Sequence, residues 1–122
     1  VCAINALQGM DMDLKTGRSP FAMNTAGLSG PAMFAVALAA VWRIARGVSI
    51  PVVAIGGAAS GEDVLKFLAA GAEAVQLGTA FFADPGLPGR VPTELGEFLD
   101  ARECPDLEPL KPRWRHAAEE TP

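Results

Sequence analysis

Cysteine and histidine are scarce in this sequence, and their scarcity limits the chemistry available to it. The two cysteines, Cys2 and Cys104, lie far apart and form neither a CxxC motif nor a metal-ligand spacing. This pattern is typical of reduced thiols in a cytosolic protein. Asp11 and Asp13 lack the Glu and Gly spacing of a calcium loop. We therefore predict no metal site.

The sequence also offers no clear candidate for a catalytic base. The single histidine, His116, lies beside Trp114 and Arg115 in the last part of the sequence, which is a poor setting for a general base. Neither cysteine occupies an electropositive helix start, where a reactive thiolate would be favoured. The sequence therefore assigns no catalytic residue.

Long apolar runs and basic clusters are absent as well. No apolar run reaches the ~18 residues of a membrane span, and no signal-peptide pattern is present. Residues 1–61 hold four Lys and Arg against two Asp and Glu, whereas residues 62–122 hold six against twelve. An acidic second half without a basic cluster disfavours nucleic-acid binding. We therefore expect a soluble cytoplasmic protein with no membrane and no nucleic-acid partner.

Two short apolar strands, each followed by a glycine turn, form the strongest pattern that is present. Val52–Ile55 ends in Gly56-Gly57, and Ala74–Leu77 ends in Gly78-Thr79. A continuous apolar strand is typical of a parallel sheet covered on both faces. The loops after the last two strands of a (β/α)₈ barrel build a phosphate site from bare backbone amides in this way. Tight turns without a ligand are the alternative for each motif.

This pattern predicts an α/β fold, the carboxyl-terminal half of a (β/α)₈ TIM barrel. Residues 1–101 would form the half barrel, and residues 102–122, where Pro, Glu, Lys and Arg dominate, a loosely ordered tail. A complete barrel needs about 250 residues. The sequence has 122 residues and opens on Val1 without an initiator methionine. We therefore expect a fragment of a longer protein.

The remaining elements are predicted from apolar period and turn residues. They are a strand at Val1–Ile4, a long loop at 8–26 with a small hairpin around Thr16-Gly17, a helix from Gly30-Pro31 to a stop at Gly47, a helix capped by Ser60–Asp63 and ended by Gly71, a short helix at Thr79–Ala83, a turn at 85–92 and a final helix at Glu94–Ala101.

Three further features could belong to the same site. The segment Gly27–Pro31 precedes the first predicted helix, so its amides could meet the same anion, although a helix start with a first-turn proline explains it equally well. Asn5 follows the first strand, and its amide would suit a planar imide substrate, while a turn-forming role is the alternative. Lys15 could contact an anion or remain a solvated loop residue.

Several motifs occur in one fixed order along residues 1–100. They are Ile4-Asn5-Ala6-Leu7-Gln8-Gly9-Met10, Asp13-Leu14-Lys15-Thr16-Gly17, Gly27-Leu28-Ser29-Gly30-Pro31-Ala32, Gly56-Gly57 and Gly78-Thr79-Ala80. In this order they resemble the carboxyl-terminal part of class 1 dihydroorotate dehydrogenases, most closely the catalytic subunit of the NAD-linked type. The Gly-Leu-Ser-Gly-Pro-Ala motif is quite specific, whereas the Gly-Gly and Gly-Thr elements are shared more widely among flavin and phosphate barrels.

The resemblance implies a barrel that holds FMN at the carboxyl ends of its strands and oxidises dihydroorotate to orotate in pyrimidine biosynthesis. Ile4 would lie along the flavin, and Asn5 would hydrogen-bond the pyrimidine ring. The other FMN contacts, mostly around the phosphate, would come from Gly30, Gly56, Gly57, Gly78 and Thr79. Hydride would pass from substrate carbon to flavin N5 while a cysteine or serine base removes the neighbouring proton. The resemblance further implies a homo-oligomer when full length and a partner subunit with FAD and an iron–sulfur cluster.

Two departures from the family bear on these expectations. The family usually has Ser or Thr after the Asn, where this sequence has Ala6; the lost hydroxyl would be worth about 0.5–1.5 kcal/mol in a substrate hydrogen bond. The base loop, the flavin-contacting lysines and several substrate asparagines belong to the earlier half of the barrel, which this sequence does not include. Cys2 lies within a predicted strand and does not replace the base. We therefore expect this chain alone neither to turn over dihydroorotate nor to hold FMN tightly.

Other interpretations stay open. A dihydropyrimidine dehydrogenase domain is a related flavin barrel. A dihydrouridine synthase would need a basic RNA-binding surface, which the acidic second half does not provide. A dehydrogenase of the inosine monophosphate type would need a catalytic cysteine near the glycine turns, where none occurs. A half barrel without catalysis, which pairs through its exposed sheet edges, belongs to a different class.

Overall fold

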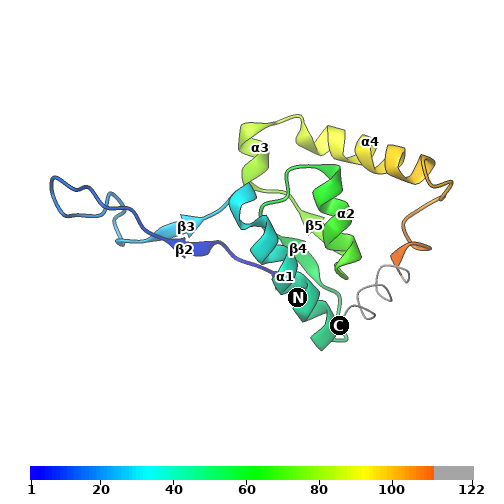
Figure 1. Ribbon diagram of the computed structural model, residues 1–122, viewed down its shortest axis with the longest axis horizontal. Coiled ribbons are helices and arrows are strands. Elements are labelled where there is room, and N and C mark those ends of the chain that lie inside the picture. The colour runs from blue at the N-terminus through cyan, green and yellow to red at the C-terminus, as the bar shows by residue number, and fades with distance from the viewer. Residues whose placement is uncertain (112–122) are drawn as a thin grey trace.

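The computed structural model describes residues 1–111 and is built around a parallel sheet of three strands (Figure 1). The strands are β1 (Cys2–Ala3), β4 (Val53–Ile55) and β5 (Ala74–Gln76), in the order β1-β4-β5. The helices α1 (Phe34–Gly47) and α2 (Gly61–Ala69) make the crossovers between them. The predicted alternation of strand and helix is confirmed, and each strand is shorter than the sequence predicted.

One face of this sheet is covered by the two crossover helices. In the parallel register Ala3 pairs with Ala54, which in turn pairs with Val75, so these three residues share a face. Ala3 and Ala54 are buried in a cluster with side chains of α1 and α2. Phe34 and Phe67 meet there edge to face, with ring centroids 5.1 Å apart.

The opposite face has no such cover. Cys2, Val53 and Ala74 share this face by register, and Cys2 and Ala74 are exposed. The prediction of a strand covered on both faces is therefore wrong for residues 1–111: β4 is buried at Ala54 but only half-buried at its two ends. A strand that is covered by helices on one face needs apolar side chains on that face only, whereas the sequence of β4 is apolar on both faces.

The first helix starts where the sequence predicted but ends differently. A 3₁₀ turn at Pro31–Met33 (η1) leads into α1, with the proline in its first turn as expected. The predicted left-handed stop at Gly47 is wrong, because Gly47 is the last residue of α1 and the capping residue after it, Val48, is extended with φ −130°. The chain reverses direction between α1 and β4 in the loop after α1, without a left-handed residue at Gly47.

The final helix begins earlier than predicted. The short helix α3 (Thr79–Ala83) is confirmed, but α4 spans Leu87–Asp100 and replaces the turn expected at 85–92. One proline lies in the first turn of this helix, where proline is tolerated, whereas Pro92 lies inside the helix. Leu87 and Val91 are buried against α2 in a second apolar cluster. This packing favours helix where the local sequence favours a turn.

The predicted loop at 8–26 is largely an antiparallel hairpin that projects from the body of the molecule (Figure 1). Its strands are β2 (Leu7–Gly9) and β3 (Ala26–Leu28). The smaller hairpin around Thr16-Gly17 is confirmed by a bridge between Asp13 and Arg18 and by Gly17 at φ 68°. Several apolar side chains of the hairpin are exposed; the largest exposed fractions are 93% for Leu14 and 84% for Met23.

After α4 the described chain continues to Lys111. Leu110 is buried, and the Lys111 ammonium forms ion pairs with Glu73 at 3.1 Å and with Glu108. The rest of the predicted tail, with Trp114 and His116, lies outside the described residues. Among the helices of residues 1–111, none combines the length and the hydropathy that crossing a membrane would require.

Candidate functional site

A cavity of about 380 Å³ lies at the carboxyl ends of the three parallel strands. All seven residues that the sequence proposed for binding line it: Ile4, Asn5, Gly30, Gly56, Gly57, Gly78 and Thr79. The rest of the lining is Cys2, Ala6, Ser29, Met33, Ile55, Ala58, Gln76 and Ala80. The fold thus brings together residues from four separate segments of the chain, although their binding roles remain predictions.

The Gly56-Gly57 turn has a structural reason for its glycines. Their φ angles are 137° and 77°, in the region that side chains rarely adopt. A Cβ at Gly56 would lie 2.6 Å from Cβ of Ala37, and one at Gly57 would lie 2.7 Å from the Gly30 carbonyl oxygen. The turn is packed directly against the start of α1. Protein packing alone therefore requires both glycines.

Gly78 has no such reason. No heavy atom of residues 1–111 lies within 4 Å of the place its Cβ would occupy, and the residue is exposed. Within residues 1–111, the amide groups of Gly57 and Gly78 donate no hydrogen bond to a protein acceptor. The open space beside Gly78 would let a ligand approach the backbone closely, which a larger residue would obstruct.

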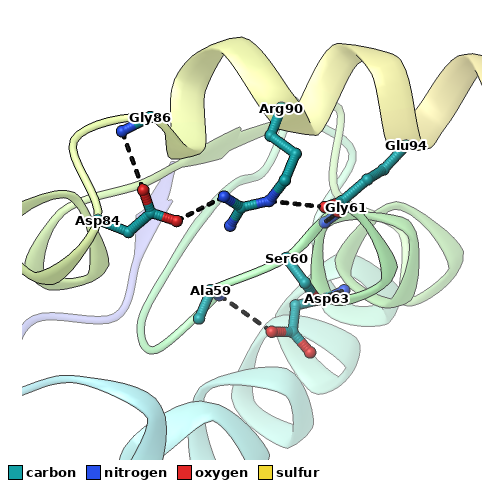
Figure 2. A network of polar contacts seen from close by, with 8 residues as sticks. All are labelled: Ala59, Ser60, Gly61, Asp63, Asp84, Gly86, Arg90 and Glu94. Carbon is teal, nitrogen blue, oxygen red and sulfur yellow. Dashed lines mark hydrogen bonds and ion pairs between the residues drawn. The ribbon is translucent and has the colours of Figure 1, made fainter.

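The amides at the start of α2 are already used by the protein (Figure 2). Ser60 caps the helix as predicted, since its Oγ accepts the amide of Asp63 at 3.1 Å. Asp63 in return accepts the amide of Ala59 at 3.0 Å. The carboxylate of Glu94, on α4, accepts the amide of Gly61. This helix start is thus occupied by two carboxylates and is not available for a ligand anion.

Arg90 holds the second carboxylate in place (Figure 2). Its Nε lies 2.9 Å from Glu94 Oε1, and the other side of its guanidinium donates to Asp84. The hydrogen bond from Arg90 lowers the pKa of Asp84 from its usual value. Arg90 and Glu94 form an i, i+4 pair, a spacing visible in the sequence, but the contact with Gly61 depends on how α4 lies over α2.

Two hydroxyl groups meet across the mouth of the cavity. Thr79 Oγ1 donates a hydrogen bond of 2.9 Å to Ser29 Oγ. Ser29 was not among the predicted site residues, although it lies inside the Gly27–Pro31 segment. The only sequence signal for Ser29 was its place in that segment, whose backbone amides were the predicted donors. Its partner Thr79 lies 50 positions away in the chain, so no local pattern predicts the contact.

Asn5 and Ile4 lie at the end of β1. Asn5 Oδ1 accepts the amide of Ala6 at 2.8 Å, which leaves the two side-chain N–H donors of this exposed residue for a ligand. The backbone amide of Ile4 donates to Ile55 at 2.8 Å, so this end of the cavity is tied to β4. Both predicted roles, turn former and ligand donor, are compatible with this geometry.

Among the described residues that line the cavity, none has a charged side chain. Lys15 lies in the projecting hairpin and is not part of the lining; nearby, the amide of Lys15 and the hydroxyl of Thr16 donate to Asp13 and lower its pKa. Cys2 lies with its Sγ 3.8 Å from Oε1 of Gln76, on the uncovered face. Among the described residues, no group of three or more His, Cys, Asp or Glu could hold a metal ion. The lining can therefore recognise a ligand through neutral donors and apolar contact.

Comparison with known proteins gives one consistent result. The family model described as dihydroorotate dehydrogenase matches residues 1–99. The sequence is 49% identical over 107 residues to the catalytic subunit of dihydroorotate dehydrogenase B (NAD(+)) from Geobacter metallireducens, which covers 88% of this chain and 35% of the relative. The corresponding subunit from Bacillus pumilus is 45% identical over 116 residues, 94% of this chain and 37% of that relative. The chain thus spans little more than a third of the length of the curated relatives it matches.

Proposed function

The chain belongs to the dihydroorotate dehydrogenase family, and we propose that it supplies the carboxyl-terminal part of an FMN-dependent enzyme that oxidises dihydroorotate to orotate in pyrimidine biosynthesis. The observation that carries the proposal is the cavity. The seven residues named from the resemblance come from four segments of the chain, yet all of them line it. A set of unrelated glycine turns would have no reason to converge in this way.

The residues of the cavity fit the phosphate and ring of FMN. Gly57 and Gly78 offer amide donors without a protein acceptor, and the space beside Gly78 admits a close approach to its backbone. Ile4 and Met33 supply apolar contact for a planar ring. When bound, FMN would supply the hydride acceptor of the reaction. The chain's own task is to fix the ring and to hold the phosphate.

The substrate would be oriented by Asn5. Its carbonyl oxygen accepts the amide of Ala6, so its two N–H donors are left for a carbonyl of the pyrimidine ring. Ala6 lines the same cavity but offers no hydroxyl. We therefore expect binding of dihydroorotate to depend more on Asn5 here than in relatives with a hydroxyl at the next position.

A (β/α)₈ barrel is the fold that we propose for the whole protein. Parallel strands alternate with helices as they do in a barrel, and the sheet has an uncovered face around Cys2 and Ala74. The sheet also has two unpaired edge strands, β1 and β5, among the described residues. In a closed barrel this face would point inward and both edges would be paired. The chain's share of its relatives' length leaves room for the other strands.

Two kinds of partner follow from the same proposal. The relatives are named as catalytic subunits of an NAD(+) enzyme, and we propose a partner subunit with FAD and an iron–sulfur cluster for this protein as well. We also propose a homo-oligomer, supported by the exposed apolar side chains Leu14 and Met23 on the projecting hairpin.

The two cysteines, which form no disulfide, support a cytoplasmic location.

A chimeric enzyme tests the function directly. The chain replaces the matching third of the Geobacter metallireducens relative, and the purified chimera is assayed for bound flavin and for formation of orotate from dihydroorotate. We expect it to retain FMN and activity. The Asn5→Ala variant of the chimera should keep its FMN but lose about tenfold or more in kcat/KM, because one or two substrate hydrogen bonds are removed.

The controls separate the parts of the proposal. Ala6→Ser should raise the affinity for dihydroorotate, because it adds a hydroxyl beside Asn5, and it serves as the matched gain-of-function variant. A folded chimera that binds no FMN would refute the cofactor assignment. A chimera that binds FMN but oxidises dihydrouracil in place of dihydroorotate would refute the substrate assignment and favour a dihydropyrimidine dehydrogenase.

A further inference from the structure

The projecting hairpin, residues 7–28, holds most of the methionines of this chain. The sequence has four, of which Met10, Met12 and Met23 lie on the hairpin, whereas Met33 lies in η1. We propose that the hairpin is a site of methionine oxidation, where hydrogen peroxide converts the three thioethers to sulfoxides and thereby weakens association of this chain with a second copy. The second part rests on the proposed function, since the homo-oligomer belongs to it.

Exposure separates the four side chains into two groups. The exposed fraction is 84% for Met23, 57% for Met10 and 48% for Met12, whereas it is 2% for Met33. Peroxide in the solvent can meet the three exposed thioethers directly. It can meet Met33 only when the structure opens locally, so we expect a reaction at least about tenfold slower there.

Local hydrogen bonds hold Met23 in an exposed turn. The amide of Asn24 donates to the carbonyl oxygen of Phe21 at 2.9 Å, and the Ser19 hydroxyl donates to the carbonyl oxygen of Asn24 at 3.0 Å. Asn24 has φ 62°, in the left-handed region where asparagine is enriched. The exposure of Met23 therefore follows from the conformation of the turn around it.

The chemistry is a two-electron oxidation at sulfur. The O–O bond of hydrogen peroxide breaks, one oxygen atom forms a bond to the thioether sulfur, and the other leaves as water with both hydrogens. The sulfur is oxidised and the peroxide is reduced, so no further reactant is needed. The product replaces a flexible apolar side chain with a polar, chiral one.

The hairpin has the properties of a surface that contacts a second copy. Leu14 and the methionine side chains give it exposed apolar area. Its charged residues are two acidic and two basic ones, namely Asp11, Asp13, Lys15 and Arg18. With a net charge of zero, two hairpins do not repel each other, and each offers both signs to the other, which suits a two-fold interface between identical surfaces. Three sulfoxides would make this apolar surface polar.

Peroxide treatment of the complete 122-residue chain tests the modification site. The reaction is quenched at timed intervals, dithiothreitol reduces reversibly oxidised cysteines, and peptide mass mapping locates each added oxygen atom. We expect Met23 to react first, the other two hairpin methionines next, and Met33 last. Oxidation of Met33 as fast as the hairpin methionines would overturn the proposal, and so would a hairpin that gains no oxygen.

Sedimentation velocity before and after the treatment measures the effect on association. We expect the unmodified chain to associate and its dissociation constant to rise at least about tenfold after oxidation, because three apolar side chains become polar. Treatment with methionine sulfoxide reductases should restore the association. A chain that associates equally well before and after oxidation would overturn this inference and leave the proposed homo-oligomer intact. An unmodified chain that stays monomeric would overturn both, but not the proposed reaction.

The matched control is the triple variant Met10→Leu, Met12→Leu, Met23→Leu. Leucine has a similar volume and no sulfur, so this variant should associate like the unmodified chain and should not respond to peroxide. Met23→Gln introduces a polar side chain and should weaken association without peroxide. If peroxide still dissociates the triple leucine variant, the responsible group lies elsewhere and the proposal is wrong.

Discussion

Gly57 and Gly30 touch through their backbones: a Cβ added to Gly57 would lie 2.7 Å from the carbonyl oxygen of Gly30. The same atom would also lie 2.7 Å from the amide nitrogen of Phe34, at the start of α1. Two loops that the sequence identifies separately as glycine turns are therefore one packed unit. Gly78, on the third loop, has open space in the corresponding place.

Gly57→Ala should destabilise the fold. The new methyl group would strike backbone atoms, and the φ of 77° is unfavourable for alanine, so we expect a loss of about 2–4 kcal/mol in the free energy of unfolding. Urea denaturation followed by circular dichroism measures it. Gly78→Ala is the matched control and should change stability by less than about 0.5 kcal/mol. Equal effects at the two positions would contradict the packing described here.

Gly78→Val should leave the fold intact but impair ligand binding. Its side chain would enter the open space of the cavity, where we expect the phosphate to approach the backbone, and the affinity for FMN should fall at least about tenfold. A titration of the variant with FMN, followed by NMR chemical shifts, measures this affinity. Gly47→Val is the control, since a Cβ added at Gly47 would also have no atom of the described residues within 4 Å, but Gly47 does not line the cavity. Undiminished affinity in Gly78→Val would place the phosphate elsewhere.

Glu94→Ala should loosen α4 from α2. The carboxylate accepts the amide of Gly61, which is buried, and it is also held by Arg90 (Figure 2). Its removal leaves that amide without an acceptor, and we expect a cost of about 1–2 kcal/mol in unfolding free energy. Glu97→Ala, at an exposed position of the same helix, should cost little. A similar stability for the two variants would mean that the network contributes nothing.

Acid should weaken the contact between Asp84 and Arg90. The hydrogen bond from Arg90 lowers the pKa of Asp84 in the folded state below its value in the unfolded chain, about 3.9. The contribution to stability is therefore complete above that unfolded value and is lost as the pH falls through the lower folded one. Asp84→Asn should flatten the dependence of the melting temperature on pH between about pH 5 and pH 2. An unchanged slope in Asp84→Asn would contradict this role of the Asp84 carboxylate.

Local sequence patterns predicted which strands and helices form better than they predicted how those elements pack. The strands before Gly56 and Gly78 and the helix capped by Ser60 were found because apolar runs, glycines and a capping serine act over a few residues. The start of α4 at Leu87 was missed, because its prolines and glycines favour a turn and only burial against α2 outweighs them. The exposed face at Cys2 was also missed, since an apolar strand does not reveal how many layers cover it.

The sequence by itself determined the alternation of the parallel strands with the crossover helices, the family, and which seven residues to examine for binding. Only the tertiary structure decided which groups meet. Ser29 and Thr79 are 50 positions apart and Gly61 and Glu94 are 33 apart, and no local pattern specifies either contact. Propensity and apolar period act within one element, whereas these contacts depend on the docking of elements whose separation along the chain carries no periodic signal.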